Sequence, residues 1–367
     1  MQILSRGGYT VDILILTGKF GMGHWSASLS LQGQLEADGH SVILKDFFDY
    51  ALPELAPSMY RGFRFLVTRM GGVYNLYHRM TRNASGEILL AGLLERRLGE
   101  LLDAVRQELI LSTHPVCSGV VSGYKGHTGN AIPLITCLTD VTSHSEWIHP
   151  GTDFYLAPSP EVRQALADKG VDPDRILAGG IPVRDRFDSA GRRQDGPRQL
   201  LIMGGGLGLM PRKDSFYGAL NALEGVHTTI LTGKNQRLYR RLAGKYENLE
   251  VVPFTDRVPE YMARAHLMLS KPGGITVFEA IAARLPMLAW EPFLEQEREN
   301  ADFLVRNGMA RVAAKEEEAC LAAIRETIYD ERQLRSMERA MERLTAVLCQ
   351  NAACAAVDAV AREAVCA

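Results

Sequence analysis

Residues 266–284 read HLMLSKPGGITVFEAIAAR: a short apolar run, a turn with two glycines, and the start of a helix. The run over 266–270 is typical of a buried parallel strand, and the pattern that follows predicts a helix over 275–284. Gly273 and Gly274 make the turn and leave no side chain in front of the helix. The first backbone N–H groups there have no partner within the helix, and the helix dipole adds partial positive charge. This stretch therefore predicts a phosphate site.

Two side chains of the predicted helix suit a nucleotide. Thr276 adds a hydroxyl donor beside the phosphate. Glu279 lies one turn deeper at the same end, where a carboxylate can accept hydrogen bonds from both hydroxyls of a ribose. The alternative is a plain strand–turn–helix with glycines for close packing, because two glycines after a strand are weak evidence alone.

The composition is that of a globular protein without a strong charge bias. The chain has 367 residues, of which 46% are hydrophobic and 23% are charged, and its formal net charge is −2. This length predicts two domains. The charge provides no global field that would attract nucleic acid or anionic lipid, so any such attraction must be local, and we expect no nucleic-acid partner.

The six cysteines form no CxxC pair and have no metal-ligand spacing. This usage predicts reduced thiols in a cytosolic protein and no metal site. We find no signal peptide and no run approaching the roughly 18 apolar residues of a spanning helix. We therefore expect that the protein meets a membrane only at its surface.

The first half of the chain predicts a parallel sheet with a functional histidine. Val11–Leu16 is an apolar, β-branched run typical of a central strand, and a helix is expected from about Trp25. His24 falls in the first turn of that helix, where the positive helix end disfavours an imidazolium. A neutral imidazole can take a proton from a hydroxyl. A capping or core histidine is the alternative, but Gly23 and the glycine two residues before it clear space for a ligand and favour function.

Further polar residues follow other predicted strands of this half. His114, Asp140 and His144 all come directly after such strands, and functional side chains gather beyond the carboxyl ends of strands in open parallel sheets. Asp140 can orient a nearby histidine or hold a sugar hydroxyl. Loop capping is the alternative for each residue alone, and their clustering favours a site.

The segment Tyr60–Arg82 departs from this alternation. It mixes aromatic, aliphatic and basic residues and contains no Asp or Glu. Positive charge among aromatic rings is typical of an interfacial helix on anionic lipid. An RNA partner, a protein groove, or a packing helix with solvated arginines are the alternatives.

The second half repeats the α/β rhythm after a stretch rich in Gly, Asp, Pro and Arg at 188–198, which we interpret as a linker. A predicted strand is followed by a glycine loop with Gly205 and Gly206. Phe254 follows another strand and can present its ring or its backbone to a base.

Gln296 and Glu297 open a later helix with amide and carboxylate groups that can bind sugar hydroxyls. A capping box is the alternative for this pair.

The predicted fold class is α/β, with two Rossmann-like doubly wound domains facing a central cleft. We expect a first domain over 1–187, a linker over 188–198 and a second domain over 199–345. The final helix, 346–367, is expected to pack back on the first domain.

Taken in order, these motifs resemble those of the monogalactosyldiacylglycerol synthases and the bacterial processive diacylglycerol glucosyltransferases, and more distantly the peptidoglycan N-acetylglucosaminyltransferase. The resemblance runs nearly end to end. Its markers are Gly21–His24, His114-Pro115, Thr139-Asp140 with His144 and Trp147, Gly180–Arg184, Gly204–Gly208, Gly233–Asn235, Lys271–Thr276, Glu279-Ala280, and Gln296-Glu297 with Asn300.

The resemblance implies a GT-B fold and an inverting transfer of a hexose from a UDP-sugar to a diacylglycerol-type lipid. It implies His24 as the candidate base, with Asp140 as its partner or as an alternative base. The expected donor-binding residues are Gly23, Gly205, Gly206, Phe254, Gly274, Ile275, Thr276, Glu279, Gln296 and Glu297.

The resemblance also bears on partners and location. It implies no cofactor beyond the UDP-sugar donor and no bound metal. It implies a cytoplasmic protein held at the inner face of the cell membrane, with Tyr60–Arg82 as the acceptor and membrane segment. Leu294 and Glu295 replace the family's usual Pro-Gly, so the donor sugar stays open. The alternatives are a soluble or cell-wall-precursor acceptor, or a UDP-sugar epimerase, hydrolase or sensor of the same fold.

Overall fold

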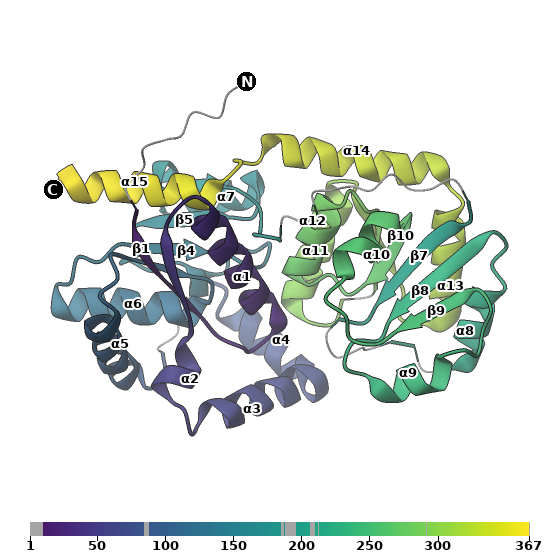
Figure 1. The fold of residues 1–367 in the computed structure, drawn as a ribbon, viewed down its shortest axis with the longest axis horizontal. Coiled ribbons are helices and arrows are strands. Elements are labelled where there is room, and N and C mark those ends of the chain that lie inside the picture. Colours follow the sequence, from purple (N-terminus) through teal and green to yellow (C-terminus); the bar gives the residue numbers. More distant parts are fainter. Residues whose placement is uncertain are drawn as a thin grey trace. The chain divides into compact units, whose positions relative to one another are not determined.

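The computed structural model describes residues 10–83, 88–184, 187, 196–205, 210–211, 213–290 and 292–366. They form two compact units. Unit 1 comprises the described residues up to Pro182 together with those from Leu348 onward, and unit 2 comprises those from Val183 to Val347. The division falls shortly before the predicted linker over 188–198, most of which lies outside the described residues. Each unit has a parallel sheet with helices on both faces (Figure 1), which confirms the predicted α/β class.

The sheet of unit 1 has six parallel strands in the order β2-β1-β3-β4-β5-β6. The strands are β1 (Asp12–Thr17), β2 (Ser41–Asp46), β3 (Leu109–Ser112), β4 (Leu134–Cys137), β5 (Phe154–Ala157) and β6 (Ile176–Ala178). The direction of winding reverses between β1 and β3, which pair directly with Leu16 opposite Ser112. Ligands bind in open α/β sheets at such a switch point, beyond the carboxyl ends of the strands.

The helices of unit 1 cover both faces of this sheet. They are α1 (Met22–Ala37), α2 (Phe47–Ala51), α3 (Ala56–Arg69), α4 (Gly71–Met80), α5 (Ala91–Val105), α6 (Pro115–Thr128), η1 (Ser145–Trp147), α7 (Pro160–Ala167), η2 (Pro173–Arg175) and α15 (Ala352–Cys366). Ile13 and Ile15 of β1 pack with α1 and α15 in one core. Leu14 and Leu16 pack with α2, α5 and α6 in another. Alternate residues of one apolar strand thus supply both cores, as expected of a central parallel strand.

The helix α15 belongs to unit 1. It contacts α1, β5 and β6, and Ala356 and Val357 are fully buried in the core that it shares with α1. Of the predicted C-terminal helix, 346–367, the first two residues belong to a helix of unit 2 that ends at Val347, and the part from Ala352 onward forms α15 in unit 1.

One segment, Glu331–Arg362, is apolar enough by length and composition to cross a membrane, with a mean hydropathy of 1.5 over 18 residues. We expected no run that approaches this length, and the segment meets the criterion as an average over alanine-rich sequence that still contains Gln350 and Asp358. The segment is interrupted, since one helix ends at Val347 and α15 begins at Ala352. The buried residues of α15 are those of a core helix in a globular unit.

The sheet of unit 2 is also fully parallel, in the order β12-β11-β10-β7-β8-β9. Its strands are β7 (Arg198–Met203), β8 (Val226–Leu231), β9 (Leu249–Val252), β10 (Leu267–Ser270), β11 (Met287–Trp290) and β12 (Ala310–Ala313). Its helices are α8 (Asp214–Asn221), α9 (Gln236–Leu242), α10 (Val258–Arg264), α11 (Gly274–Ala282), α12 (Glu295–Arg306), α13 (Glu317–Ile328) and α14 (Glu331–Val347). This is the strand order of a dinucleotide-binding fold, with its switch point between β7 and β10. β10 and α11 are the strand and helix predicted from 266–284.

Candidate active site

His24 lies at the switch point of unit 1, shortly after β1. The helix α1 begins at Met22, and Gly21 before it has extended backbone; among the described residues no side chain caps this helix end. A Cβ atom added at Gly21 or Gly23 would meet no other described atom within 4 Å. The predicted glycines thus leave open space in front of the histidine, as a ligand requires.

The hydrogen bonds of His24 fix its tautomer. Its Nδ1 lies 2.8 Å from the carbonyl oxygen of Thr113, just after β3, and 2.8 Å from Oγ1 of Thr139, just after β4. A carbonyl oxygen can only accept, so Nδ1 carries the proton and donates it. The other nitrogen, Nε2, is then the unprotonated one. It has no hydrogen-bond partner in the part of the chain that the structure describes, and it can accept a proton from a substrate.

A chain of hydroxyl groups holds this backbone in place. Oγ1 of Thr113 lies 2.8 Å from Oγ1 of Thr17 and 2.7 Å from Oγ of Ser28, and Ser28 donates to the carbonyl oxygen of His24 at 2.8 Å. Thr17, Ser28 and Thr113 are all fully buried. The network ties the ends of β1 and β3 to the first turn of α1, so the position of the imidazole is set by the core of the sheet.

His24 is neutral at physiological pH. Burial lowers its pKa to about 4, and the hydrogen bond to Thr113 opposes this shift only in part. The sequence had predicted a neutral histidine from the helix dipole, whereas burial is the main cause in the structure. A neutral imidazole with an unprotonated Nε2 is the form that a general base needs.

His114 forms the wall beside this histidine. The two ring centroids are 4.8 Å apart, and Nδ1 of His114 accepts the backbone N–H of Val116 at 3.2 Å, which caps α6. Burial holds the pKa of His114 well below its usual range. His114 therefore has the capping role that the sequence left open as its alternative.

Asp140 was the predicted partner or alternative to the base. It is half-buried in the loop after β4, one residue beyond Thr139. The orienting contacts of His24 come from Thr113 and Thr139, and sequence reasoning had not given Thr139 a role of its own. Its place directly after a buried parallel strand was the available signal. The role of Asp140 stays a prediction.

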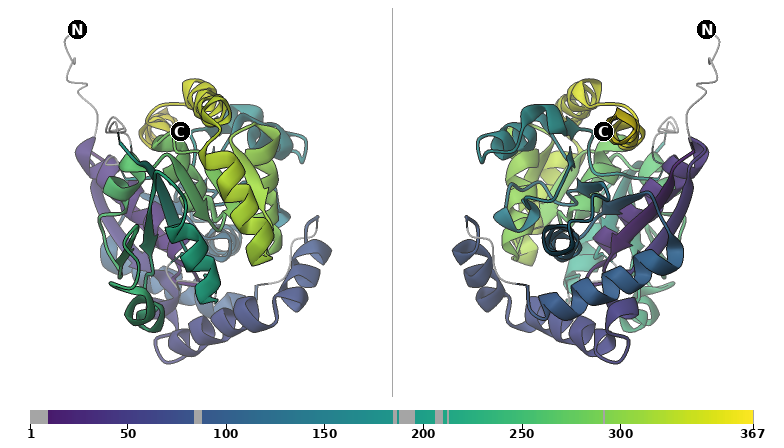
Figure 2. Two further views of the ribbon diagram at one scale, coloured as in Figure 1. Left: turned by 90° about the vertical axis from the view of Figure 1, so that its right-hand side faces the viewer. Right: turned by 90° about the vertical axis from the view of Figure 1, so that its left-hand side faces the viewer.

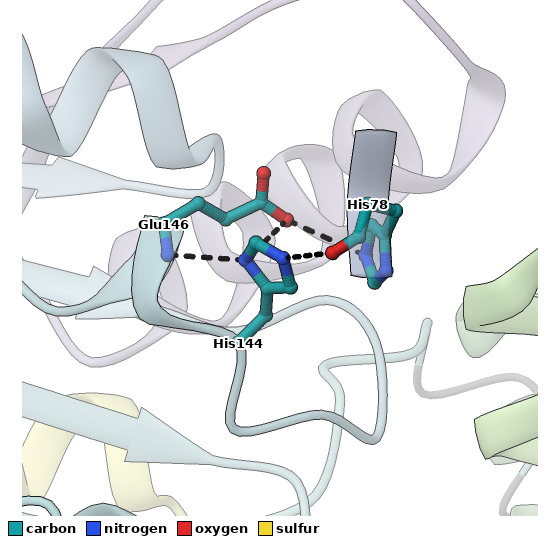
Figure 3. Close-up of side chains that lie close together, drawn as sticks. All are labelled: His78, His144 and Glu146. Carbon is teal, nitrogen blue, oxygen red and sulfur yellow. Dashed lines mark hydrogen bonds and ion pairs between the residues drawn. The ribbon is translucent and has the colours of Figure 1, made fainter. Parts of the chain in front are cut away.

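His78, His144 and Glu146 come close together in unit 1 (Figure 3). Their candidate ligand atoms lie within 4.8 Å of one another, close enough to hold a metal ion. Nδ1 of His144, however, accepts the backbone N–H of Glu146 at 3.2 Å, and its Nε2 donates to the carbonyl oxygen of His78 at 2.9 Å. Both nitrogens of His144 have backbone partners, so we interpret this group as a structural connection between α4 and η1.

The switch point of unit 2 carries the predicted phosphate site. α11 begins at Gly274; among the described residues no side chain caps its start, and its first turn holds no acidic residue. Ser270 of β10 pairs with Met203 of β7, so the loops after both strands leave the same place on the sheet edge. Gly205 in the β7 loop has a φ of +66°, a conformation that favours glycine. Gly206 lies outside the described residues.

The other residues predicted around this helix end lie as follows. Ile275, Thr276 and Glu279 are half-buried in α11. Burial raises the pKa of Glu279 to about 7, and the positive charge of Arg184 opposes this shift. A carboxylate with this pKa is poorly solvated and will bind hydroxyl donors readily. Phe254 follows β9 with 61% of its surface exposed, so its ring is available to a ligand.

Glu297 has structural partners in unit 2. Its carboxylate accepts the backbone N–H groups of Phe293 and Leu294 at 3.1 and 3.3 Å, and it forms an ion pair with Lys271 at 3.3 Å. This is the capping-box alternative, and the ion pair fixes the turn before α11 to the start of α12. Gln296 differs: its Oε1 is buried without a hydrogen-bond partner among the described residues, as expected of a group that binds a sugar hydroxyl.

Two fully parallel doubly wound units, one with a neutral histidine and one with an uncapped helix start at its switch point, have the architecture of the GT-B fold class. Solved structures have the same fold. The glycotransferase of kitacinnamycin matches with a TM-score of 0.66 at 17% identity, over 96% of this chain and 98% of its own. Acinetobacter baumannii MurG matches with a TM-score of 0.62 at 16% identity, over 95% and 99%.

Sequence comparison gives the family. The monogalactosyldiacylglycerol synthase family model matches residues 24–183, and the glycosyltransferase family 28 C-terminal domain model matches residues 210–351. The processive diacylglycerol beta-glucosyltransferase of Staphylococcus aureus is 30% identical over 364 residues, 92% of this chain and 91% of that protein. That of Bacillus subtilis is 28% identical over 351 residues, 89% of each. The chain belongs to this family of glycosyltransferases.

Proposed function

We propose that the protein transfers a hexose from a UDP-sugar to the hydroxyl of a diacylglycerol-type lipid, with inversion at the anomeric carbon. The observation that carries this proposal is the neutral, oriented imidazole of His24 at the switch point of unit 1. The names of its relatives, which are diacylglycerol glucosyltransferases, support the acceptor class.

In this proposal His24 is the general base. Its Nε2 takes the proton of the acceptor hydroxyl as the oxygen attacks the anomeric carbon from the face opposite the leaving group. The donated Nδ1–H bond to Thr113 stabilises the imidazolium that forms. Asp140 is proposed to support this charge or to hold a sugar hydroxyl.

Unit 2 is proposed to bind the donor. The N–H groups at the start of α11 bind the diphosphate and stabilise the negative charge that grows as UDP leaves. Glu279 accepts hydrogen bonds from the ribose hydroxyls, Phe254 contacts the uracil base, and Gln296 contacts the hexose. We propose that this charge stabilisation operates without a metal or further cofactor, since the uncapped start of α11 supplies partial positive charge.

The assay that tests this function uses radiolabelled UDP-glucose, UDP-galactose and UDP-N-acetylglucosamine, each with dioleoylglycerol in mixed vesicles. We expect label in the organic phase with at least one donor and a β-anomeric product by NMR. Label only in a water-soluble acceptor, free sugar, or an epimerised donor would each overturn the lipid-transferase proposal and identify its replacement.

We also propose that α3 and α4 hold the protein on an anionic membrane surface. Arg61, Arg64 and Arg69 are exposed, and so are Phe65 and several apolar residues of α4. Figure 2 shows these two helices at the periphery of unit 1. Basic and apolar side chains on one exposed helical pair suit the boundary between head groups and acyl chains.

Vesicle flotation tests this membrane contact. Replacing Arg61, Arg64 and Arg69 with Ser removes about 1 kcal/mol of attraction per arginine, so binding to anionic vesicles falls by about 100-fold. The matched control replaces three exposed arginines of α14 with Ser, namely Arg332, Arg335 and Arg339, and keeps flotation. Native protein that fails to float on anionic vesicles contradicts the proposal.

A further inference from the structure

An apolar cavity of about 820 Å³ lies within unit 1. Helices α2, α3, α5 and α6 supply part of its lining, and the loops beside them supply most of the rest. The lining residues are Phe20, Phe48, Leu52, Leu55, Ser58, Met59, Tyr77, Thr81, Ile88, Leu89, Leu90, Ala91, Leu94, Pro115, Val116, Gly119, His144, Glu146 and His149. Among the described residues the lining contains no lysine or arginine, so the cavity is not suited to a sugar nucleotide or another anion.

The cavity has a closed end and an open rim. Phe48, Leu52 and Leu94 are at most 6% exposed and form its interior. Leu55 and Leu89, which also line it, are 52% and 84% exposed. Exposed apolar residues that lie together mark interaction sites or ligand-binding grooves, and here they surround the opening of the cavity. The rim is therefore suited to an apolar ligand that enters from an apolar phase.

The polar groups of the lining have partners within the protein. Both nitrogens of His144 bond to backbone, and Nε2 of His149 contacts the carbonyl oxygen of Pro115 at 3.2 Å. The two histidines thus need no polar ligand to satisfy these groups. A ligand that fills the cavity can be a hydrocarbon.

The interior of the cavity approaches the catalytic histidine. Phe20 and Phe48 line the cavity, and both ring centroids lie 5.2 Å from that of His114. The ring of His114 in turn lies 4.8 Å from that of His24. One aromatic layer therefore separates the cavity from the proposed base.

We infer that this cavity binds one acyl chain of the acceptor lipid and so positions the lipid hydroxyl for transfer. The inference rests on the proposed function, which it deepens by assigning the acceptor subsite. With about 30 Å³ per methylene, comparable to the share of one water in the liquid, an 18-carbon chain fills roughly 540 Å³ and two such chains roughly 1,080 Å³. The cavity accommodates one chain, and the second chain of a diacylglycerol remains in the membrane.

A substitution that fills the cavity tests the inference. Ala91, the first residue of α5, lines the cavity, and Ala91→Phe places a ring in it. The matched control is Ala104→Phe, an exposed position near the other end of the same helix that does not line the cavity. We compare dioleoylglycerol with dibutyrylglycerol, whose chains are too short to reach the interior. Ala91→Phe should lower kcat/KM more than about tenfold for the long-chain acceptor and at most about twofold for the short one, since each lost methylene contact weakens binding.

A binding measurement separates this inference from the proposed function. cis-Parinaric acid, an 18-carbon fluorescent fatty acid, should bind the native protein and the control, be displaced by dioleoylglycerol, and bind Ala91→Phe at least about tenfold more weakly. Absence of lipid glycosylation overturns the proposed function. Binding of the fatty-acid probe to the native protein and to Ala91→Phe still shows whether the cavity takes an acyl chain. Equal loss with both acceptors, or unchanged probe binding, overturns the inference. Ser58→Phe, at an exposed lining position, repeats the test if Ala91→Phe does not fold.

Discussion

His24 is in the protonation state that a general base needs: its Nε2 is unprotonated and has no described partner, and a pKa of about 4 keeps the ring neutral at physiological pH. His24→Ala should lower kcat by about 10²- to 10⁴-fold, the usual contribution of a positioned base. The dissociation constant of UDP should stay nearly unchanged, because all the proposed donor-binding residues except Gly23 belong to unit 2. Steady-state kinetics and calorimetry measure the two quantities.

The control for this substitution is His127→Ala, at a mostly exposed histidine of α6 that pairs with Glu95 at 2.7 Å. It should leave kcat unchanged. A His24→Ala variant with near-native kcat removes His24 from the role of base, and Asp140 then becomes the residue to test.

At the scale of single residues, the residue types of the site could be predicted from the sequence, but the hydrogen-bond partners that orient His24 could not. His24 directly follows a glycine, and Glu279 lies in the helix that begins at the glycine pair Gly273-Gly274; such turns follow from local sequence. Thr113 and Thr139 orient His24 from 89 and 115 residues away. The burial that lowers the pKa of His24 likewise comes from distant segments, so no local pattern in one sequence reports it.

Among the elements, β10 and α11 were the best predicted. An unbroken apolar run, a glycine pair and a helical apolar pattern each depend on neighbouring residues only, and observed bounds of 267–270 and 274–282 differ little from the predicted 266–270 and 275–284. The helices α3 and α4 were predicted only as an irregular aromatic and basic stretch, Tyr60–Arg82. The cavity of unit 1 arises from packing between elements, which the periodicity of one segment does not contain.

The uncapped start of α11 allows a prediction in which stability and binding change in opposite directions. Gly273 has φ −70° and open space around its Cβ position, so other residues fit there. Gly273→Asp places a good helix cap at the N-terminus and should keep or raise the melting temperature. The same carboxylate repels the diphosphate and should weaken UDP binding by about tenfold or more.

Gly273→Asn is the matched control for this change, because asparagine caps as well as aspartate without the charge. It should bind UDP more tightly than Gly273→Asp at the same stability. Equal UDP affinity in the native protein and in Gly273→Asp would show that the diphosphate lies elsewhere.

At the scale of the whole molecule, two compact units with separate cores are expected to unfold as separate transitions. Their pH dependence should differ in sign. In unit 1 burial lowers the pKa of His24 to about 4 and that of His114 well below the usual value. Between about pH 4 and 6.5 the unfolded unit therefore binds more protons than the folded one, and its free energy of unfolding rises with pH, by up to about 1.4 kcal/mol per pH unit for each histidine.

In unit 2 the sign is reversed, because burial raises the pKa of Glu279 to about 7. The folded unit holds a proton that the unfolded chain has already released above pH 4.5, so this contribution to stability is present below pH 4.5 and is lost as pH rises to 7. Differential scanning calorimetry from pH 4.5 to 7 should show one transition moving up and the other moving down. His24→Gln should flatten the first and Glu279→Gln the second. Two transitions that move together in the native protein would mean that these buried groups do not govern the pH dependence of the units.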